Sequence, residues 1–78
     1  MKVRVLVSLK PGVLDAQGRA IEHALKDLGY AQVQGVRTGK QIVLDLATDD
    51  AGRARALASE LCEKLLANPV IEQFEILV

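Results

Sequence analysis

The first ten residues alternate between apolar and polar side chains, which limits what this segment can become. Valine or leucine stands at positions 3, 5, 7 and 9, and lysine, arginine or serine occupies positions 2, 4, 8 and 10. A repeat of two residues is typical of a β-strand with one buried face. Pro11-Gly12 then predicts a turn that ends the strand.

The next pattern repeats every three to four residues and predicts a helix. Asp15 can cap its first turn, and Gly29 stands where helices commonly end in a left-handed conformation. The apolar face expected for this helix consists of Ala20, Ile21, Ala24, Leu25 and Leu28.

From Ala31 to Thr38 the pattern is less regular. Val33 and Val36 are three residues apart, so they share a face of a strand only if a bulge near Gly35 breaks the pleat. We predict a bulged strand here. A tight turn at Thr38-Gly39 would join it as a hairpin to a third strand with apolar residues at positions 42, 44 and 46.

The remaining third of the chain predicts a second helix and a last strand. Thr48, Asp49 and Asp50 are N-cap candidates, and Asn68-Pro69 ends the helix before a strand over Val70 to Val78. The apolar face expected for the helix consists of Ala54, Leu57, Ala58, Leu61 and Leu65.

The predicted order, βαββαβ, is that of an α+β, ferredoxin-like fold in a single domain over residues 1–78. Its antiparallel sheet carries both helices on one face and leaves the other face open. Scattered exposed aliphatic residues are normal on any surface. Four on one small sheet face instead favour a homodimer or tetramer, and the predicted interface residues are Leu6, Val43, Ile71 and Leu77.

Charge and composition exclude several classes of protein. The net charge is zero, no basic stripe occurs, and the only aromatic residues are Tyr30 and Phe74, so nucleic-acid binding is not expected. The single Cys62 excludes an internal disulfide and is expected to be a small core residue. No segment resembles a membrane span or a signal peptide, and we expect a cytoplasmic protein.

Two polar connections, residues 8–18 and 36–40, are the first candidates for a binding surface, because loops on a rigid scaffold often carry contacts. Lys10, Arg37 and Lys40 fit ordinary solvated charges as well as contact residues. Asp15 fits a helix cap better than a catalytic carboxylate. The predicted partner-binding residues are Lys10, Asp15, Gln17, Gly18, Arg37, Gly39 and Lys40.

No residues of the chain form a recognisable catalytic or metal-binding pattern. There is no nucleophile paired with a base, no metal-ligand cluster and no phosphate loop, and His23 has no second histidine near it. Val33-Gln-Gly-Val36 matches the core of the acylphosphatase signature. It follows the first helix instead of preceding it, which excludes that enzyme. The sequence therefore predicts no catalytic residue, metal site or cofactor in this chain.

Four segments, in order and over the whole chain, resemble PurS, the small subunit of phosphoribosylformylglycinamidine synthase. Ala16 departs from the family, which usually has proline there, and proline at the first helical position is favoured but not required. The segments that carry the resemblance are Ser8–Gly18, Ala24–Tyr30, Val36–Lys40 and Leu61–Glu72.

The resemblance implies a non-catalytic subunit of an enzyme complex in purine biosynthesis. In that family's complex, the glutaminase PurQ releases ammonia, and the synthetase PurL uses ATP and Mg²⁺ to form the amidine. PurS is expected to bridge the two and to assist ammonia transfer. Glutamine, ATP and Mg²⁺ would thus be used by partner subunits.

Two other classes remain as alternatives. A dimeric regulatory module of similar topology would bind a small metabolite at its interface, and a small enzyme would need a cleft with convergent polar groups. A neighbouring reading frame for the glutaminase or the synthetase would favour the adaptor.

Overall fold

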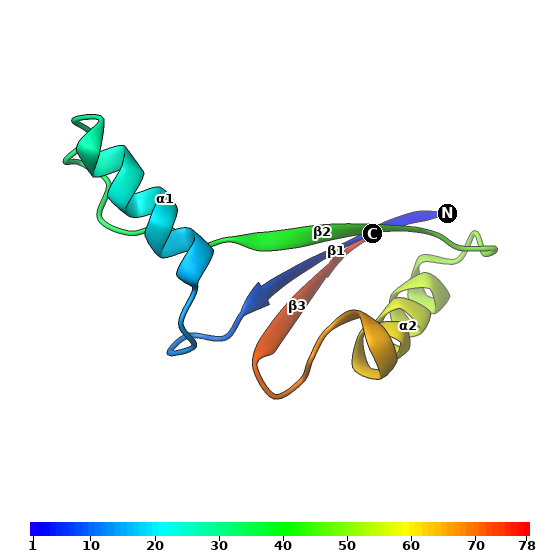
Figure 1. Cartoon of the computed structure of the whole chain (residues 1–78). Coiled ribbons are helices and arrows are strands. Elements are labelled where there is room, and N and C mark those ends of the chain that lie inside the picture. Colours follow the sequence, from blue (N-terminus) through cyan, green and yellow to red (C-terminus); the bar gives the residue numbers. More distant parts are fainter.

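The computed structural model describes residues 1–78 and has a three-stranded antiparallel sheet at its centre (Figure 1). Strand β1 (Lys2–Leu9) lies between β2 (Gly39–Asp45) and β3 (Glu72–Leu77). The alternation at the start of the chain does form a strand, and that strand pairs with both of the others. The α+β class and the antiparallel sheet with two helices are therefore confirmed.

The core lies on one face of this sheet. Val3, Val5 and Val7 of β1 are buried on this face, together with apolar residues of β2 and β3 that pack against them. Val3 pairs with Leu44 of β2, and Val5 pairs with Ile76 of β3. A period of two residues sends every second side chain to this face, as the sequence predicts.

Helix α2 (Ala51–Leu61) covers part of that face and continues into a π-helical turn, η1 (Cys62–Leu66). Asp50 is the N-cap, since its carboxylate accepts hydrogen bonds from the backbone N–H groups of Gly52 and Arg53. Alanine and cysteine allow the helix to lie close to β1, and the residues of this stretch that are fully buried are Ala54, Ala58 and Cys62.

The predicted apolar face of this helix is correct for its small residues and wrong for two leucines. Leu57 is 40% exposed and Leu65 is 83% exposed. The buried line instead follows Ala54, Ala58 and Cys62, which leaves the larger side chains on the flank of the helix. The placement of Cys62 in the core is confirmed.

Helix α1 (Ala16–Asp27) lies beyond the end of the sheet (Figure 1). Its boundaries agree with the prediction, with Asp15 as N-cap and Gly29 at φ +98° just after its end. None of its side chains belongs to the core or packs against it. The prediction that both helices cover one sheet face is therefore wrong for α1, and the molecule is elongated, with extents of 48 × 23 × 14 Å.

The strand predicted from Ala31 to Thr38 is absent, and so is the hairpin that it would form with β2. After Gly29 the chain makes a turn and returns to the sheet as an extended, unpaired segment beside α1 (Figure 1). The backbone N–H of Thr38 donates to the Asp15 carboxylate and not to a neighbouring strand. The sheet consequently has three strands and not four. The last strand is also shorter than predicted, because Ile71 lies in the turn before β3.

No helix of the chain is long and apolar enough to span a membrane.

Candidate functional site

The two polar connections meet at the end of the sheet where β1 finishes and β2 begins. Residues 10–15 lead from β1 into α1, and residues 36–38 lead back into β2. Hydrogen bonds between side chains of one connection and backbone groups of the other join them. Segments far apart in the sequence thus form a single surface, which we call the junction.

Asp15 is the centre of the junction, and it is 5% exposed. Its carboxylate accepts hydrogen bonds from the backbone N–H of Gly18 at 2.8 Å and from that of Thr38 at 2.5 Å. The Thr38 hydroxyl donates to the same carboxylate at 2.8 Å. One side chain therefore caps α1 and fixes the point where the returning segment enters β2.

The same donors change the acidity of this carboxyl group. The backbone N–H of Thr38, followed by that of Gly18 and by the Thr38 hydroxyl, holds the pKa of Asp15 below its usual range. Burial acts in the opposite direction, and the nearby Arg37 guanidinium adds a smaller lowering of the pKa. Asp15 is therefore ionised at neutral pH, with its oxygen atoms occupied by donors from the chain itself.

Gly18 is required by the close approach of the two connections. A Cβ atom at this position would lie 2.5 Å from the carbonyl oxygen of Val36 and 2.8 Å from the Asp15 carboxylate. Gly18 and Asp15 are both buried, so they have little surface to offer to a partner. Both residues make their contacts within the chain, and their partner-binding role stays a prediction.

Arg37 and Lys10 connect the junction to its neighbours. The Arg37 guanidinium donates to the carbonyl oxygens of Val13, Leu9 and Lys10 at 3.0, 3.4 and 3.3 Å. The Lys10 ammonium donates to the carbonyl of Pro69 at 2.7 Å, in the turn that precedes β3. Both side chains keep part of their cationic surface open to solvent.

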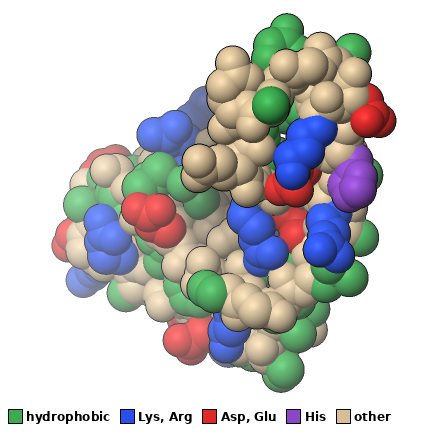
Figure 2. All heavy atoms as spheres, turned by 90° about the vertical axis from the view of Figure 1, so that its left-hand side faces the viewer, with side chains coloured by type: hydrophobic (Ala, Val, Ile, Leu, Met, Phe, Trp, Pro, Cys, Tyr) green, Lys and Arg blue, Asp and Glu red, His purple; other side chains and the backbone are tan.

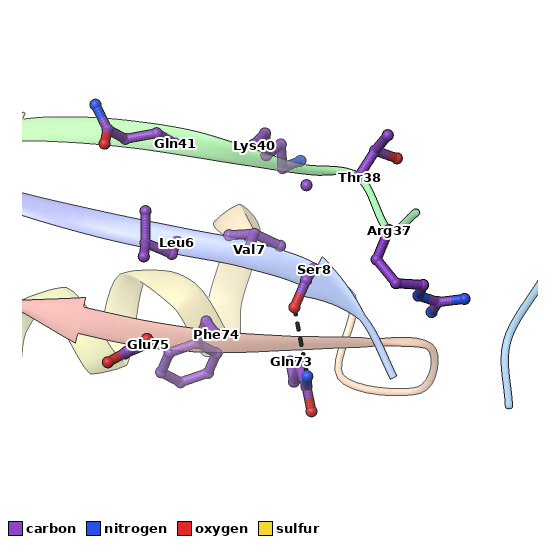
Figure 3. A pocket seen from close by; sticks show the side chains of 11 residues that line it. Leu6, Val7, Ser8, Arg37, Thr38, Lys40, Gln41, Gln73, Phe74 and Glu75 are labelled. Atoms are coloured by element: carbon purple, nitrogen blue, oxygen red, sulfur yellow. Dashed lines mark hydrogen bonds between the residues drawn. The ribbon is translucent and has the colours of Figure 1, made fainter. Parts of the chain in front are cut away.

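Beside the junction lies an open groove of about 540 Å³ that is lined by all three strands (Figure 3). Ser8 of β1 and Gln73 of β3 are joined across it by a hydrogen bond of 3.4 Å. Arg37 and Lys40 lie at its β2 side. The groove is therefore polar and cationic at one rim, and it is open to solvent along its length.

The exposed part of the predicted partner-binding set gathers around this end of the molecule. Figure 2 shows several lysine and arginine side chains close together on the face that carries α1. The structure keeps at the surface Lys10, Gln17, Arg37, Gly39 and Lys40.

Three of the four predicted oligomer residues, Leu6, Val43 and Leu77, lie on the sheet face opposite α2. Val43 is 53% exposed, and Leu6 is half-buried between Gln41 of β2 and Glu75 of β3. Leu77 lies beside Arg4, and Ile71 precedes the strand. The open face is thus a mixture of apolar and charged side chains. It is more polar than the four predicted aliphatic residues alone suggest.

The junction can make contacts but offers few groups for chemistry. The hydrogen bonds to its carboxylate leave Asp15 poorly suited to act as a base. His23 is exposed on α1, and no group of three potential metal ligands occurs. Thr38 is the structural residue that sequence reasoning missed, since no local pattern connects it to a carboxylate 23 residues earlier.

Replacement of Asp15 by asparagine is expected to lower the midpoint of thermal unfolding by roughly 4–8 °C near neutral pH, the shift that about 1 kcal/mol causes in a small domain, because the Thr38 donors lose their carboxylate acceptor. The amide keeps one oxygen for Gly18 but turns an N–H₂ group towards the Thr38 donors. Thermal unfolding followed by circular dichroism measures the change.

The pH dependence of this difference follows from the lowered pKa of Asp15. A carboxyl group with a lower pKa in the folded state stabilises the fold above its unfolded pKa of about 3.9, and this stabilisation is lost as the pH falls towards the folded pKa. The gap between the native chain and Asp15→Asn should therefore narrow below about pH 4. A gap that stays constant from neutral pH to below pH 3 would contradict this role of the ionised carboxylate.

Comparison with known proteins identifies the family. The model of the family described as PurS: Phosphoribosylformylglycinamidine (FGAM) synthase matches residues 2–78. The phosphoribosylformylglycinamidine synthase subunit PurS of Bacillus subtilis is 51% identical over 73 residues, which cover 94% of this chain and 86% of that protein.

Solved structures agree with this match. PurS of Methanocaldococcus jannaschii, one of the subunits of formylglycinamide ribonucleotide amidotransferase, superposes with a TM-score of 0.88 at 41% identity and covers 97% of this chain and 92% of that chain. A chain in the structure of PurLQS from Thermotoga maritima superposes with a TM-score of 0.88 at 32% identity. The match covers 97% of this chain and 93% of that chain.

These superpositions include α1 and its two connections. Residues 11–38 make up more than a third of the chain, so such a score over 97% of it requires the relatives to hold α1 away from the sheet as well. The match in sequence and the match in this outstretched arrangement lead to one conclusion: the chain belongs to the PurS family of phosphoribosylformylglycinamidine synthase subunits.

Proposed function

We propose that this chain is the non-catalytic adaptor subunit of phosphoribosylformylglycinamidine synthase in purine biosynthesis. In this role it bridges a PurQ-like glutaminase and a PurL-like synthetase, assists the transfer of ammonia between them, and works in the cytoplasm. ATP, Mg²⁺ and glutamine are used by those partner subunits and not by this chain.

The observation that carries the proposal is the similarity, over nearly the whole length, to a chain of the PurLQS structure. The junction supports the same function. Its buried carboxylate is taken up by bonds within the chain, whereas Gln17, Arg37 and Lys40 remain at the surface as contact groups. A surface of this kind can hold two partners together. It can also exclude water from the path between them, as the transfer of ammonia without loss requires.

The adaptor is proposed to act as a homodimer or tetramer. Large apolar side chains are exposed at the end of α1 and on η1, with Leu28 73% exposed and Leu65 83% exposed. Monomeric proteins rarely leave large apolar surfaces uncovered. Light scattering at micromolar concentration should therefore give a mass of at least two chains.

The proposal is tested by leaving the chain out of a reconstituted mixture of the glutaminase and the synthetase. Glutamine-dependent amidine formation is expected to fall nearly to background, because ammonia is no longer passed between joined subunits. The rate with added ammonium salt should stay the same, because the synthetase keeps its own active site. Full glutamine-dependent activity without the chain would contradict the adaptor function.

The groove beside the junction favours one other candidate, a module that binds a small metabolite and regulates the complex. Arg37 and Lys40 at its rim suit an anionic group. Calorimetric titration of the isolated chain with ATP, ADP or glutamine separates the two functions. The adaptor is expected to show no saturable heat, whereas a regulatory module would show a defined stoichiometry.

A further inference from the structure

We propose that the groove beside the junction receives an extended peptide segment of another subunit of the enzyme complex. The segment carries an acidic side chain at the junction end of the groove and a basic side chain at the other end. The inference rests on the proposed adaptor function and specifies the chemistry of one of its contacts.

The groove lies on the sheet face opposite α2, and the strand register defines its floor. Side chains alternate along a strand, so the floor residues point away from the buried valines of β1. They form two rows that cross all three strands, and these rows are Gln41–Leu6–Glu75 and Gly39–Ser8–Gln73.

The groove continues past the end of the sheet. A second hollow, of about 450 Å³, shares Ser8, Arg37 and Gln73 with it and reaches the turn at Pro11 and Gly12. The two hollows together form a long open depression that leads from the strands to the connection before α1. A shape of this kind suits an extended peptide better than a compact metabolite, which needs a more enclosed site.

The floor offers a hydrogen-bond donor and an acceptor side by side. The Gln73 side-chain N–H donates to the Ser8 hydroxyl oxygen at 3.4 Å (Figure 3). In this bond the hydroxyl is the acceptor, so the Ser8 O–H remains free to donate and the Gln73 carbonyl oxygen remains free to accept. A peptide group has one C=O and one N–H to pair with them. The floor therefore matches the backbone of a segment that lies across it.

The two ends of the groove carry opposite charges. Arg37 and Lys40 lie at its β2 side, and Glu75 lies on β3 (Figure 3). None of these three side chains takes part in an ion pair within the chain. The Arg37 guanidinium is held in place by neutral carbonyl oxygen atoms, so its charge remains available to a partner. Charge complementarity thus favours an occupant that is anionic at the junction and cationic over β3.

The separation of these charges also favours a peptide over a free amino acid. Lys40 and Glu75 lie on the two outer strands of the sheet, which are about 10 Å apart across β1. The charged groups of a free amino acid are joined through a single carbon atom and cannot reach both ends. An extended chain advances about 3.3 Å per residue, so an acidic and a basic residue about three positions apart can do so.

Photochemical cross-linking from the groove identifies its occupant. Gln41→Cys places a thiol in the groove for labelling with benzophenone maleimide, and the native Cys62 is buried and is not expected to react. The labelled chain is mixed with the glutaminase and the synthetase and irradiated, and mass spectrometry identifies the cross-linked peptides. The matched control is labelled at Gln34→Cys, which is exposed and lies outside the groove. Circular dichroism checks that each variant folds.

We expect a cross-link from Gln41→Cys to a segment of another subunit in which an acidic and a basic residue stand about three positions apart. The Gln34→Cys control should give severalfold less of this product. Equal yields from the two positions would overturn the proposal. So would a cross-linked segment without those charges, a cross-link only to a second copy of this chain, or no cross-link to either subunit.

Reversal of the charge at the β3 end of the groove is the second measurement. Glu75→Lys is expected to raise roughly fivefold the concentration of chain needed for half-maximal glutamine-dependent amidine formation, because the new lysine repels the basic side chain of the segment. A partner that met the junction through acidic groups alone would instead bind this variant more tightly. Glu63→Lys is the matched control, because Glu63 is exposed on η1 and lies outside the groove. An unchanged or lowered concentration for Glu75→Lys would overturn the proposal.

Omission of the chain from the same mixture separates this inference from the proposed function. If glutamine-dependent activity needs the chain but Glu75→Lys behaves like Glu63→Lys, the peptide groove is wrong and the adaptor function stands. If that activity does not need the chain, the adaptor function is wrong, and the cross-link from Gln41→Cys alone decides whether the groove holds a segment of another subunit.

Discussion

Replacement of Lys40 by glutamate is expected to raise about tenfold the concentration of chain needed for half-maximal glutamine-dependent amidine formation, which corresponds to about 1.4 kcal/mol of binding free energy. Lys40 is exposed at the start of β2 and takes part in none of the ion pairs of the chain. Its charge is therefore free to meet an acidic group on a partner. Reversal of that charge turns an attraction into a repulsion and leaves the fold unaffected.

The measurement compares glutamine-dependent with ammonia-dependent turnover in the reconstituted mixture. The ammonia-dependent rate should not change, since it does not require the glutaminase to be joined to the synthetase. Lys2→Glu is the matched control, because Lys2 is also exposed but lies at the far end of β1 from the junction. If Lys40→Glu behaves like Lys2→Glu, the junction is not the surface that the partners use.

Replacement of Ala58 by leucine is expected to lower the free energy of unfolding by about 1–3 kcal/mol, with a fall in Tm of at least about 4 °C. Ala58 is fully buried at the place where α2 lies against β1. A leucine there has no space and must push the helix away from the sheet. The loss is a large part of a stability that for small domains is only about 5–15 kcal/mol.

Chemical denaturation of Ala58→Leu beside Ala56→Leu measures this effect. Ala56 is on the same helix but is exposed, so a leucine there changes the composition of the chain in the same way without entering the core. A surface substitution of this kind is expected to change stability by no more than about 0.5 kcal/mol. Equal losses for the two variants would show that α2 does not lie on the sheet as described.

Much of the local structure was predictable from short stretches of sequence. The alternation of Val3, Val5 and Val7 predicts β1, and Asp15 and Asp50 predict where the two helices begin. These features depend on residues a few positions apart, whose side chains meet the backbone of the same segment. The segments that resemble PurS likewise led to the correct family.

The predicted strand from Ala31 to Thr38 shows where such reasoning fails. A strand needs a neighbour for its backbone groups, and no local pattern reveals whether that neighbour is available. Here the Thr38 N–H binds the Asp15 carboxylate, which is distant in sequence. The partner-binding residues were selected for polarity in loops, and polarity does not distinguish the buried Asp15 from the exposed Lys40.

The sequence by itself determined β1, the two helices and their N-caps, because these depend on periodicity and on contacts within a few residues. Only the tertiary structure decided what each apolar side meets. Ile21 and Leu28 have the spacing of apolar residues on a helix that covers a sheet. Helix α1 nevertheless lies beyond the sheet of its own chain, and both residues are exposed. The physical reason is that burial of an apolar surface is favourable against any apolar partner, so a hydrophobic pattern predicts that a face will be covered and does not specify by which surface.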